Sequence, residues 1–577
     1  MTKRPNRALP SVGAALVLAV ALSGCTGTTD PTETAASGAI ADLTGPDTAR
    51  EVTIALDKDS GPINLFAGAS DQLIELIYDK LLSPSPYVDE PQPWLATEVR
   101  QIDPAIWEAD LRTDVTWQDG VPFTPKDVVF SFEYMHKAPT GRYTHHVNDT
   151  PYVERAVQVD DDTVRFECRD ACPSLARVTL ADLPIVAEHI WAGIDPAQAK
   201  KVQDLPIGTG PYQLTAYSPT EGYTFSANKS YFAGTPTVDT LTMPVITNQS
   251  ATFTALQSGE IDATTRTLRP ELVAQFGQSG NLDAITTQAL SYPEIKMNFL
   301  KAPLDQPKFR RALSDAIDKE QMLDVVALGQ GRAATQGYPH PDAPFANPDN
   351  STPTDQAAAV AVLDELGYAD TDGDGVREIG GKPLVLTLLA DSGLPQDVRA
   401  AELVREDLGE VGIRVELEGM DAATLAERAT AKTFDLQVSS IGAHGVADPD
   451  QFIMSHRSGY LWATNIAWDE WDRKYAEWLS QTSHEDRIAV MQDLQAIHNA
   501  APTTVPLFYP EEHWAVSHTY GGWAASPGYG IVHKWSFLPA DVVAAAHSST
   551  VNAIIELTDT APATDVTEPP ASQGHGH

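Results

Sequence analysis

Short stretches of alternating apolar residues, separated by amphipathic segments, constrain the fold of this chain most. In "EVTIALD" the side chains of Val52, Ile54 and Leu56 share one face of an extended strand. The same period of two recurs in three further stretches, at residues 294–300, 413–419 and 434–439. Helical patterns lie between the strands, at residues 354–368 and 400–412. Because strands that alternate with helices pack as layers, we predict an α/β fold.

The chain is too long for one small domain. It has 577 residues, of which 42% are hydrophobic and 20% charged, so we expect a globular protein of two or three lobes. Its formal net charge of −40 argues against nucleic acid as a partner, because phosphates need lysine and arginine. After the N-terminal region no run of apolar residues is long enough to span a membrane.

The N-terminus has the order of an export signal. A basic leader precedes an apolar run at residues 8–22, which is too short to span a bilayer comfortably. The letters "LSGC", which end at Cys25, resemble the bacterial lipobox, in which a peptidase cuts before the cysteine and the cysteine is acylated. We predict a lipoprotein signal peptide at residues 1–24, a lipid anchor on Cys25 and a flexible tether at residues 25–49. An ordinary signal peptide with an incidental cysteine is the alternative.

The other two cysteines, Cys168 and Cys172, lie close together in "ECRDACPS". An exported protein meets an oxidising compartment, so we predict a local disulfide between them. The alternative is a metal pair, but no histidine lies near enough in the sequence to complete a tetrahedral site. We therefore predict no metal site at this pair.

The turn "DTDGDGVRE" imitates the first half of a calcium-binding loop. Asp370, Asp372 and Asp374 have the spacing of that loop, but Gly381 stands where the closing glutamate would fall. The segment is therefore either an incomplete calcium loop or an Asp/Gly turn.

Local signatures of catalysis are missing from the sequence. There is no G-x-S-x-G elbow, no H-E-x-x-H helix and no G-x-x-x-x-G-K-[ST] loop, and "GTGPYQ" lacks the third glycine of a dinucleotide fingerprint. We therefore expect neither an enzyme nor a cofactor.

A series of segments resembles, in order, the extracytoplasmic solute-binding proteins of oligopeptide and nickel ABC importers (family 5). The most typical stretch is "IWEADLRTDVTWQDGVPFTPKDVVFSFE" at residues 106–133, and "PIGTGPYQLTAY", "ATFTALQSGEID" and "KFRRALSDAIDKEQMLDVVALGQG" follow it. The resemblance extends from about residue 50 to 540. It implies a periplasmic-binding-protein-like α/β fold of the large peptide-binding subclass (type II), with two hinged lobes and a smaller additional domain.

The resemblance also implies a division of the chain. We place lobe I at residues 50–75, 205–290 and 516–545, the extra domain at residues 76–204, and lobe II at residues 291–515. Gly208 and Gly210 are candidate hinge residues, because glycine tolerates unusual backbone angles. Residues 546–577 are rich in proline, threonine and acids and are predicted to form a disordered acidic tail.

The ligand is the least determined property. Peptide-binding members of the family pair a buried aspartate with the peptide's amino group, but Gly445 stands at the expected position, with His444 beside it. A peptide or peptide-like solute is favoured. A nickel chelate held by His444 is one alternative, and an oligosaccharide on Trp462, Tyr292 and Asn465 is another.

We expect the cleft to be lined by residues that follow strands, because ligands of open α/β sheets bind beyond the carboxyl ends of the strands. The candidates are Asn64, Phe66, Tyr292, Glu294, Gly442, His444, Trp462, Asn465 and Phe508. Glu294 is the candidate anchor for an amine in place of the missing aspartate.

The resemblance implies a receptor that is lipid-anchored to the outer leaflet of the cytoplasmic membrane and acts as a monomer. Its partners would be the permease subunits of an ABC importer and their ATPase. A signalling or adhesion lipoprotein and an extracytoplasmic enzyme are the alternatives from other classes.

Overall fold

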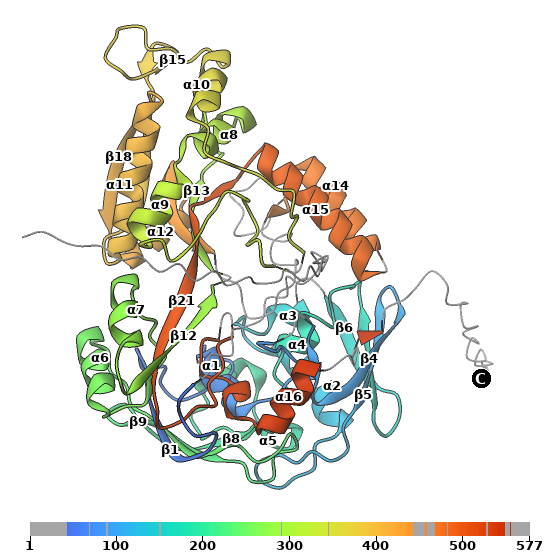
Figure 1. Cartoon of the computed structure of the whole chain (residues 1–577). Coiled ribbons are helices and arrows are strands. Elements are labelled where there is room, and N and C mark those ends of the chain that lie inside the picture. Colours follow the sequence, from blue (N-terminus) through green and yellow to red (C-terminus); the bar gives the residue numbers. More distant parts are fainter. Residues whose placement is uncertain are drawn as a thin grey trace, which may run out of the picture. The chain divides into compact units, whose positions relative to one another are not determined.

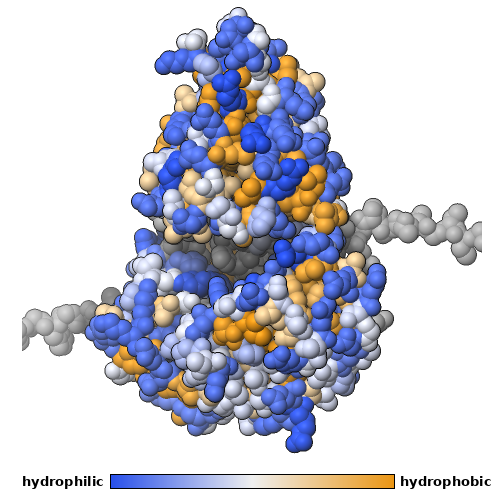
Figure 2. Space-filling view, turned by 90° about the vertical axis from the view of Figure 1, so that its left-hand side faces the viewer, coloured by the Kyte–Doolittle hydropathy of each residue, from blue (hydrophilic) through white to orange (hydrophobic). Residues whose placement is uncertain are grey.

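Within the described residues the strands are arranged in three five-stranded sheets, one three-stranded sheet and two two-stranded sheets (Figure 1). The computed structural model describes residues 43–68, 70–87, 90–148, 152–289, 291–343, 345–441, 456–458, 468–481, 483–526, 529–548 and 554–555. Helices pack against these sheets, so the predicted α/β class is confirmed. Figure 2 shows one face on which hydrophilic residues predominate and hydrophobic residues are scattered between them.

The first sheet has the strand order β11-β1-β10-β9-β8. Its strands are β1 (Ala49–Ala55), β8 (Tyr212–Ser218), β9 (Gly222–Ala227), β10 (Val238–Met243) and β11 (Ala263–Thr264). β1 is parallel to β10 and β11, and the period of two places Val52 and Ile54 in the core with no exposed area. The helices of this region are α1 (Asp71–Ile77), α6 (Gln249–Ser258) and α7 (Pro270–Gly277).

The second sheet has the order β22-β4-β5-β7-β6 and belongs to the segment predicted as the extra domain. Its strands are β4 (Ala96–Asp103), β5 (Ile106–Leu111), β6 (Val153–Gln158), β7 (Thr163–Cys168) and β22 (Ile554–Ile555). The main helix is α2 (Pro125–Lys137), in which Phe132 packs against Phe166 of β7 at a ring distance of 4.9 Å. Shorter elements are β2 (Leu82–Ser83), β3 (Gln92–Pro93), α3 (His145–Asn148), α4 (Thr179–Asp182), α5 (Glu188–Trp191) and η1 (Pro196–Lys201).

The prediction of a disordered tail from residue 546 is wrong for part of that segment. α16 (Ala540–Ser548) continues past residue 546, and β22 pairs in parallel with β4, with Ile554 opposite Val99. The Ile554 side chain is 1% exposed, because it covers apolar surface at the edge of the second sheet. Composition indicated disorder, whereas these two isoleucines are apolar enough to add a short strand.

The third sheet has the order β18-β17-β19-β13-β20. Its strands are β13 (Tyr292–Met297), β17 (Val385–Asp391), β18 (Arg414–Met420), β19 (Leu436–Ile441) and β20 (Thr504–Pro506). The helices of this part are α8 (Pro307–Ala316), α9 (Lys319–Val326), α10 (Gln356–Glu365), α11 (Pro395–Glu410), α12 (Ala422–Thr430), α14 (Asp469–Ser480) and α15 (His484–Ala500). Alternation along β17 sends Leu388 toward the core shared with α11 and Leu389 toward α12, so helices cover both faces.

Two antiparallel strands carry the chain between the first and the third sheet. β12 (Leu282–Gln288) precedes β13, and β21 (Phe508–Ser517) returns after β20. β21 pairs with β14 (Gly331–Ala333) through its first three residues and with β12 through the remainder. Figure 1 shows β12 and β21 side by side. The other short elements are β15 (Glu378–Ile379), β16 (Lys382–Pro383) and η2 (Lys534–Phe537).

Candidate functional site

The strand β13 divides its side chains between two environments. Ile295 and Met297 enter the core of the third sheet, so Tyr292 and Glu294 lie on the opposite face. That face is closed by α14, whose Trp471 is fully buried, and by α15. Tyr292 and Glu294 are only 2% and 3% exposed.

Aromatic rings surround the Tyr292 side chain. The ring centroids of Tyr338, His340 and Tyr509 lie 6.0, 6.2 and 5.3 Å from that of Tyr292. The Tyr509 hydroxyl donates to the carbonyl of Gly337. The Tyr292 hydroxyl is buried and has no hydrogen-bond partner among the described residues. Such an atom leaves a hydrogen bond available to another molecule.

His340 adds a second such group. Burial lowers the pKa of His340 to about 4, so its ring is neutral at pH 7. Its Nδ1 accepts from the backbone N–H of Asp342 at 3.1 Å, and Nε2 therefore carries the proton. Within the described part of the chain this Nε2 donor has no acceptor.

Glu294 is the acidic group of the same face. Burial raises the pKa of its carboxyl, and Lys296 opposes that effect. The ion pairs of the described residues do not include Glu294, and its Oε2 has no hydrogen-bond partner there. A buried carboxyl without a direct ion pair is suited to receive a cation from a ligand.

The register of the third sheet relates this face to the loop in which other site residues were predicted. Tyr292 lies opposite Ile441, the last residue of β19. The predicted residues Gly442 and His444 follow it, but they lie outside the described residues, as do Trp462 and Asn465. Their roles stay predictions.

The remaining predicted cleft residues are buried among protein groups. The Asn64 amide donates to the carbonyls of Ala199 and Val202, at 2.8 and 2.9 Å. The Phe66 ring packs 4.9 Å from Trp191. Phe508, at the start of β21, belongs to the core of the third sheet. These contacts account for the burial of all three side chains, and their roles in ligand binding stay predictions.

Gly208 and Gly210 lie against the end of α1. A Cβ atom at Gly208 would come within 1.9 Å of the Ile77 carbonyl oxygen, which accepts from the N–H of Gly210 at 2.8 Å. Both positions require glycine because two backbones approach closely there. Their role as a hinge stays a prediction.

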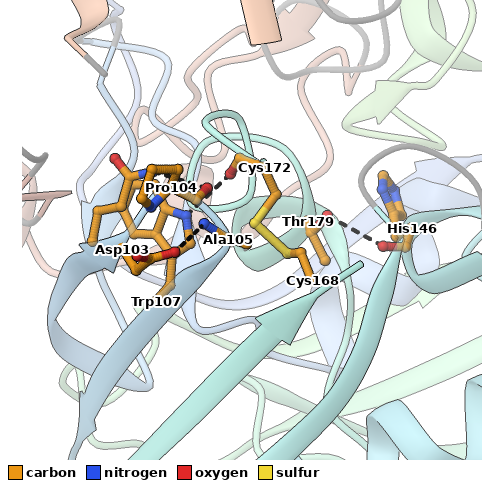
Figure 3. The surroundings of a disulfide bond; sticks show 9 residues. Asp103, Pro104, Ala105, Trp107, His146, Cys168, Cys172 and Thr179 are labelled. Carbon is orange, nitrogen blue, oxygen red and sulfur yellow. Dashed lines mark hydrogen bonds between the residues drawn. A yellow bond between two sulfur atoms is a disulfide. The ribbon is translucent and has the colours of Figure 1, made fainter. Parts of the chain in front are cut away.

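Cys168 and Cys172 are joined by a disulfide at the end of β7 (Figure 3). The N–H of Cys172 donates to the Pro104 carbonyl at 2.9 Å, and Trp107 Nε1 donates to the Cys172 carbonyl at 3.0 Å. The disulfide loop is therefore fastened to the turn between β4 and β5. Cys25, the predicted lipidation site, lies outside the described residues.

The acidic turn brings four carboxylates together. One oxygen from each of Asp370, Asp372, Asp374 and Glu378 lies within 4.8 Å of the others. Asp370 accepts from the backbone N–H groups of Gly373 and Gly375, at 2.6 and 2.9 Å. The sequence pattern did not single out Glu378, which takes part because β15 begins there.

A buried charge cluster near α1 had no signal in the sequence. Asp182, which is 2% exposed, lies 2.7 Å from Arg142, 2.7 Å from His146 and 3.3 Å from Lys80. Burial favours the neutral acid, but Arg142 and Lys80 hold the pKa of Asp182 well below its usual range. Lys80 also pairs with Glu75 at 2.5 Å. The charges of this cluster compensate one another.

The cluster continues to the C-terminal part of the chain. Asp79, which has no exposed area, pairs with Lys534 at 2.6 Å. It also accepts hydrogen bonds from Trp94 Nε1 at 2.7 Å, from the Tyr231 hydroxyl at 3.0 Å and from the Thr209 hydroxyl at 2.9 Å. These contacts join segments up to 455 residues apart in the sequence, so the cluster has a structural role.

None of the described helices has the length and apolar character needed to cross a membrane. The sheets and the two strands that connect them define a two-lobed α/β fold.

Comparison with known proteins identifies the family. Residues 90–462 match the bacterial extracellular solute-binding proteins, family 5 Middle, and the chain belongs to this family. The oligopeptide-binding protein AppA of Bacillus subtilis (strain 168) is 26% identical over 557 residues, which cover 92% of this chain and 99% of AppA. The predicted family is therefore confirmed.

Solved structures show the same fold. The structure of AppA from Bacillus subtilis in complex with a nonapeptide has a TM-score of 0.70 at 22% identity and covers 86% of this chain and 100% of AppA. The ABC transporter substrate-binding protein CtaP from Listeria monocytogenes has a TM-score of 0.75 at 20% identity, covering 85% of this chain and 99% of CtaP. The periplasmic-binding-protein-like fold is confirmed.

Proposed function

We propose that this chain is the substrate-binding component of an ABC importer. It captures a peptide or peptide-like solute between its two lobes and delivers it to the permease. The family, and the similarity to AppA, an oligopeptide-binding protein whose structure holds a nonapeptide, support this assignment.

The observation that carries the ligand class is the buried carboxyl of Glu294. Its Oε2 has no hydrogen-bond partner among the described residues, and burial raises its pKa although Lys296 and a hydrogen bond with Thr504 oppose that effect. The α-amino group of a peptide would supply a cation, and both charges would then be paired. The Tyr292 hydroxyl and the His340 Nε2–H would add hydrogen bonds to the same ligand.

The proposal includes attachment to the cell membrane through an acylated Cys25. A tethered receptor stays near the permease, and the short tether raises its effective concentration there. Several acyl chains give durable attachment, because each buried methylene contributes about 0.8 kcal/mol.

The test is calorimetric titration of the full chain with peptides of the same sequence, either with a free α-amino group or N-acetylated. We expect the free-amine peptides to bind at least about tenfold more tightly, because a charge-assisted hydrogen bond is lost on acetylation. Glu294→Gln should remove this preference. Glu416→Gln, an exposed glutamate on β18 of the same lobe, is the matched control and should behave as wild type.

Thermal unfolding gives an independent measurement. A ligand at a hundred times its Kd stabilises the folded state by about 2.7 kcal/mol. If oligosaccharides or nickel chelates raise the unfolding temperature and peptides do not, the peptide assignment is wrong. If the acetylated peptide binds as tightly as the free one, Glu294 is not the amine anchor.

A further inference from the structure

A cavity of about 620 Å³ lies between the extra-domain segment and α14. This volume is within the range of small-molecule and peptide sites. Its walls come from two parts of the chain that are about three hundred residues apart, and they are formed by Asn148, Tyr152, Arg169, Asp170, Ala171, Arg457, Tyr475, Ala476, Leu479 and Ser480. A solute held here would touch both parts at once.

The first wall is rigid. It consists of the three residues enclosed by the Cys168–Cys172 disulfide, beside Tyr152. The N–H of Cys168 donates to the Ala105 carbonyl at 2.8 Å, and the N–H of Arg169 donates to the Tyr152 carbonyl at 3.0 Å. Together with the bonds of Cys172 to Pro104 and Trp107, these contacts hold the five-residue loop at both ends. Figure 3 shows the disulfide and the contact of Cys172 with Pro104. A wall fixed in this way is preorganised for a ligand.

Arg169 presents a cation on this wall. Its guanidinium stacks 3.5 Å from the ring centroid of Tyr152, which fixes its orientation. No carboxylate of the described residues lies within ion-pair distance of Arg169. The guanidinium therefore has its hydrogen-bond donors available for an anion.

The opposite wall is a face of α14. Tyr475 and Leu479 lie one turn apart, and Ala476 and Ser480 are small and exposed beside them. This wall carries no acidic side chain into the cavity, although α14 begins with acidic residues in its first turn. This face of α14 would provide apolar and aromatic contacts for the part of a solute that lies beyond its anionic end, while the anionic end faces Arg169.

From this geometry we infer that the cavity between the disulfide loop and α14 is a subsite for the carboxylate end of a peptide ligand, with Arg169 as its anion-binding residue. The inference rests on the proposed function. Arg169 would form a bidentate pair with the carboxylate, and the contact with α14 would hold the two parts of the chain together around the ligand.

The experiment compares two peptides of one sequence, one with a free C-terminal carboxylate and one with a C-terminal amide, by calorimetric titration of the full chain. Wild type should bind the free acid about tenfold more tightly than the amide. Arg169→Gln should bind the two forms equally. Arg155→Gln, which removes a 64% exposed arginine from β6 of the same domain, is the matched control and should keep the preference.

A second variant tests the other wall. Ala476→Asp places a carboxylate on the exposed face of α14, where it would compete for Arg169, and should weaken binding of the free acid more than that of the amide. Retention of the tenfold preference in Arg169→Gln, or equal binding of both peptides by wild type, would overturn the inference but leave the peptide function standing. If wild type binds neither peptide, the proposed function fails and the inference fails with it.

Discussion

The charge cluster around Lys80 and the buried face of β13 both hold polar groups away from water. The two regions differ in whether those groups have partners. In the cluster, Asp182 contacts Arg142, His146 and Lys80 within 3.3 Å. On the β13 face, the Tyr292 hydroxyl, the His340 Nε2 and the Glu294 Oε2 have no partners in the described part of the chain. Buried polar groups that pair with one another specify the structure. A buried polar group without a partner lowers the stability of the fold, and only a ligand or a water molecule that bonds to it restores that stability.

The two regions differ in what a substitution would remove. A buried ion pair contributes little net stability, but removing one partner leaves an uncompensated charge. A buried polar atom without a partner costs about 1–3 kcal/mol, which a ligand that bonds to it would restore. Substitutions should therefore have opposite effects on stability in the two regions.

The largest effect should follow Asp182→Asn. The substitution keeps the shape of the side chain but leaves the buried Lys80 and Arg142 without the shared carboxylate. We expect the free energy of unfolding to fall by about 3–5 kcal/mol, measured by urea denaturation. Asp239→Asn breaks an exposed pair with Lys229 and should cost less than about 1 kcal/mol. If both variants lost the same free energy of unfolding, the buried ion pairs of the cluster would be no more important for stability than an exposed pair.

A matched pair of tyrosines should show the difference at a smaller scale. The Tyr231 hydroxyl donates to Asp79 at 3.0 Å, whereas the Tyr292 hydroxyl has no partner among the described residues. Tyr231→Phe should cost about 1.5–3 kcal/mol, because a hydrogen bond to a charged group is lost. Tyr292→Phe should leave the free energy of unfolding unchanged or raise it slightly. If Tyr292→Phe destabilised the ligand-free protein as much as Tyr231→Phe, its hydroxyl would have a structural partner.

The local part of the fold could be predicted from the sequence because it depends on periodicity. The period of two around Ile295 corresponds to β13, and the helical pattern at residues 400–412 corresponds to most of α11. The family followed from segments in the right order. The pairing of Ile554 with Val99 could not be predicted in this way, because it depends on two strands about 450 residues apart in the sequence.

The candidate site was predictable only in part, for the same physical reason. Tyr292 and Glu294 were found because they begin a recognisable strand. His340 lies in a proline-containing segment without periodicity, and only the fold brings it to Tyr292. Arg169 lies between the two cysteines in the sequence, but its stacking on Tyr152 follows from how the loop is held in the fold. The Asn64 amide donates to backbone carbonyls, and its role in ligand binding stays a prediction.

The smallest expected effect is the pH dependence caused by Glu294. Because burial raises its pKa above the usual value of 4.5, the folded state holds this proton over a pH range in which the unfolded state has lost it. Stability therefore falls as the pH rises through that range, and the lost stability is not regained at higher pH.

The free energy of unfolding of the ligand-free wild type, measured by urea denaturation between about pH 4 and 8, should decline relative to that of Glu294→Gln. Saturation with a free-amine peptide should reduce the decline, because the ammonium compensates the carboxylate. A wild-type curve parallel to that of Glu294→Gln would mean that Glu294 already has a partner, and the β13 face would then belong with the paired cluster.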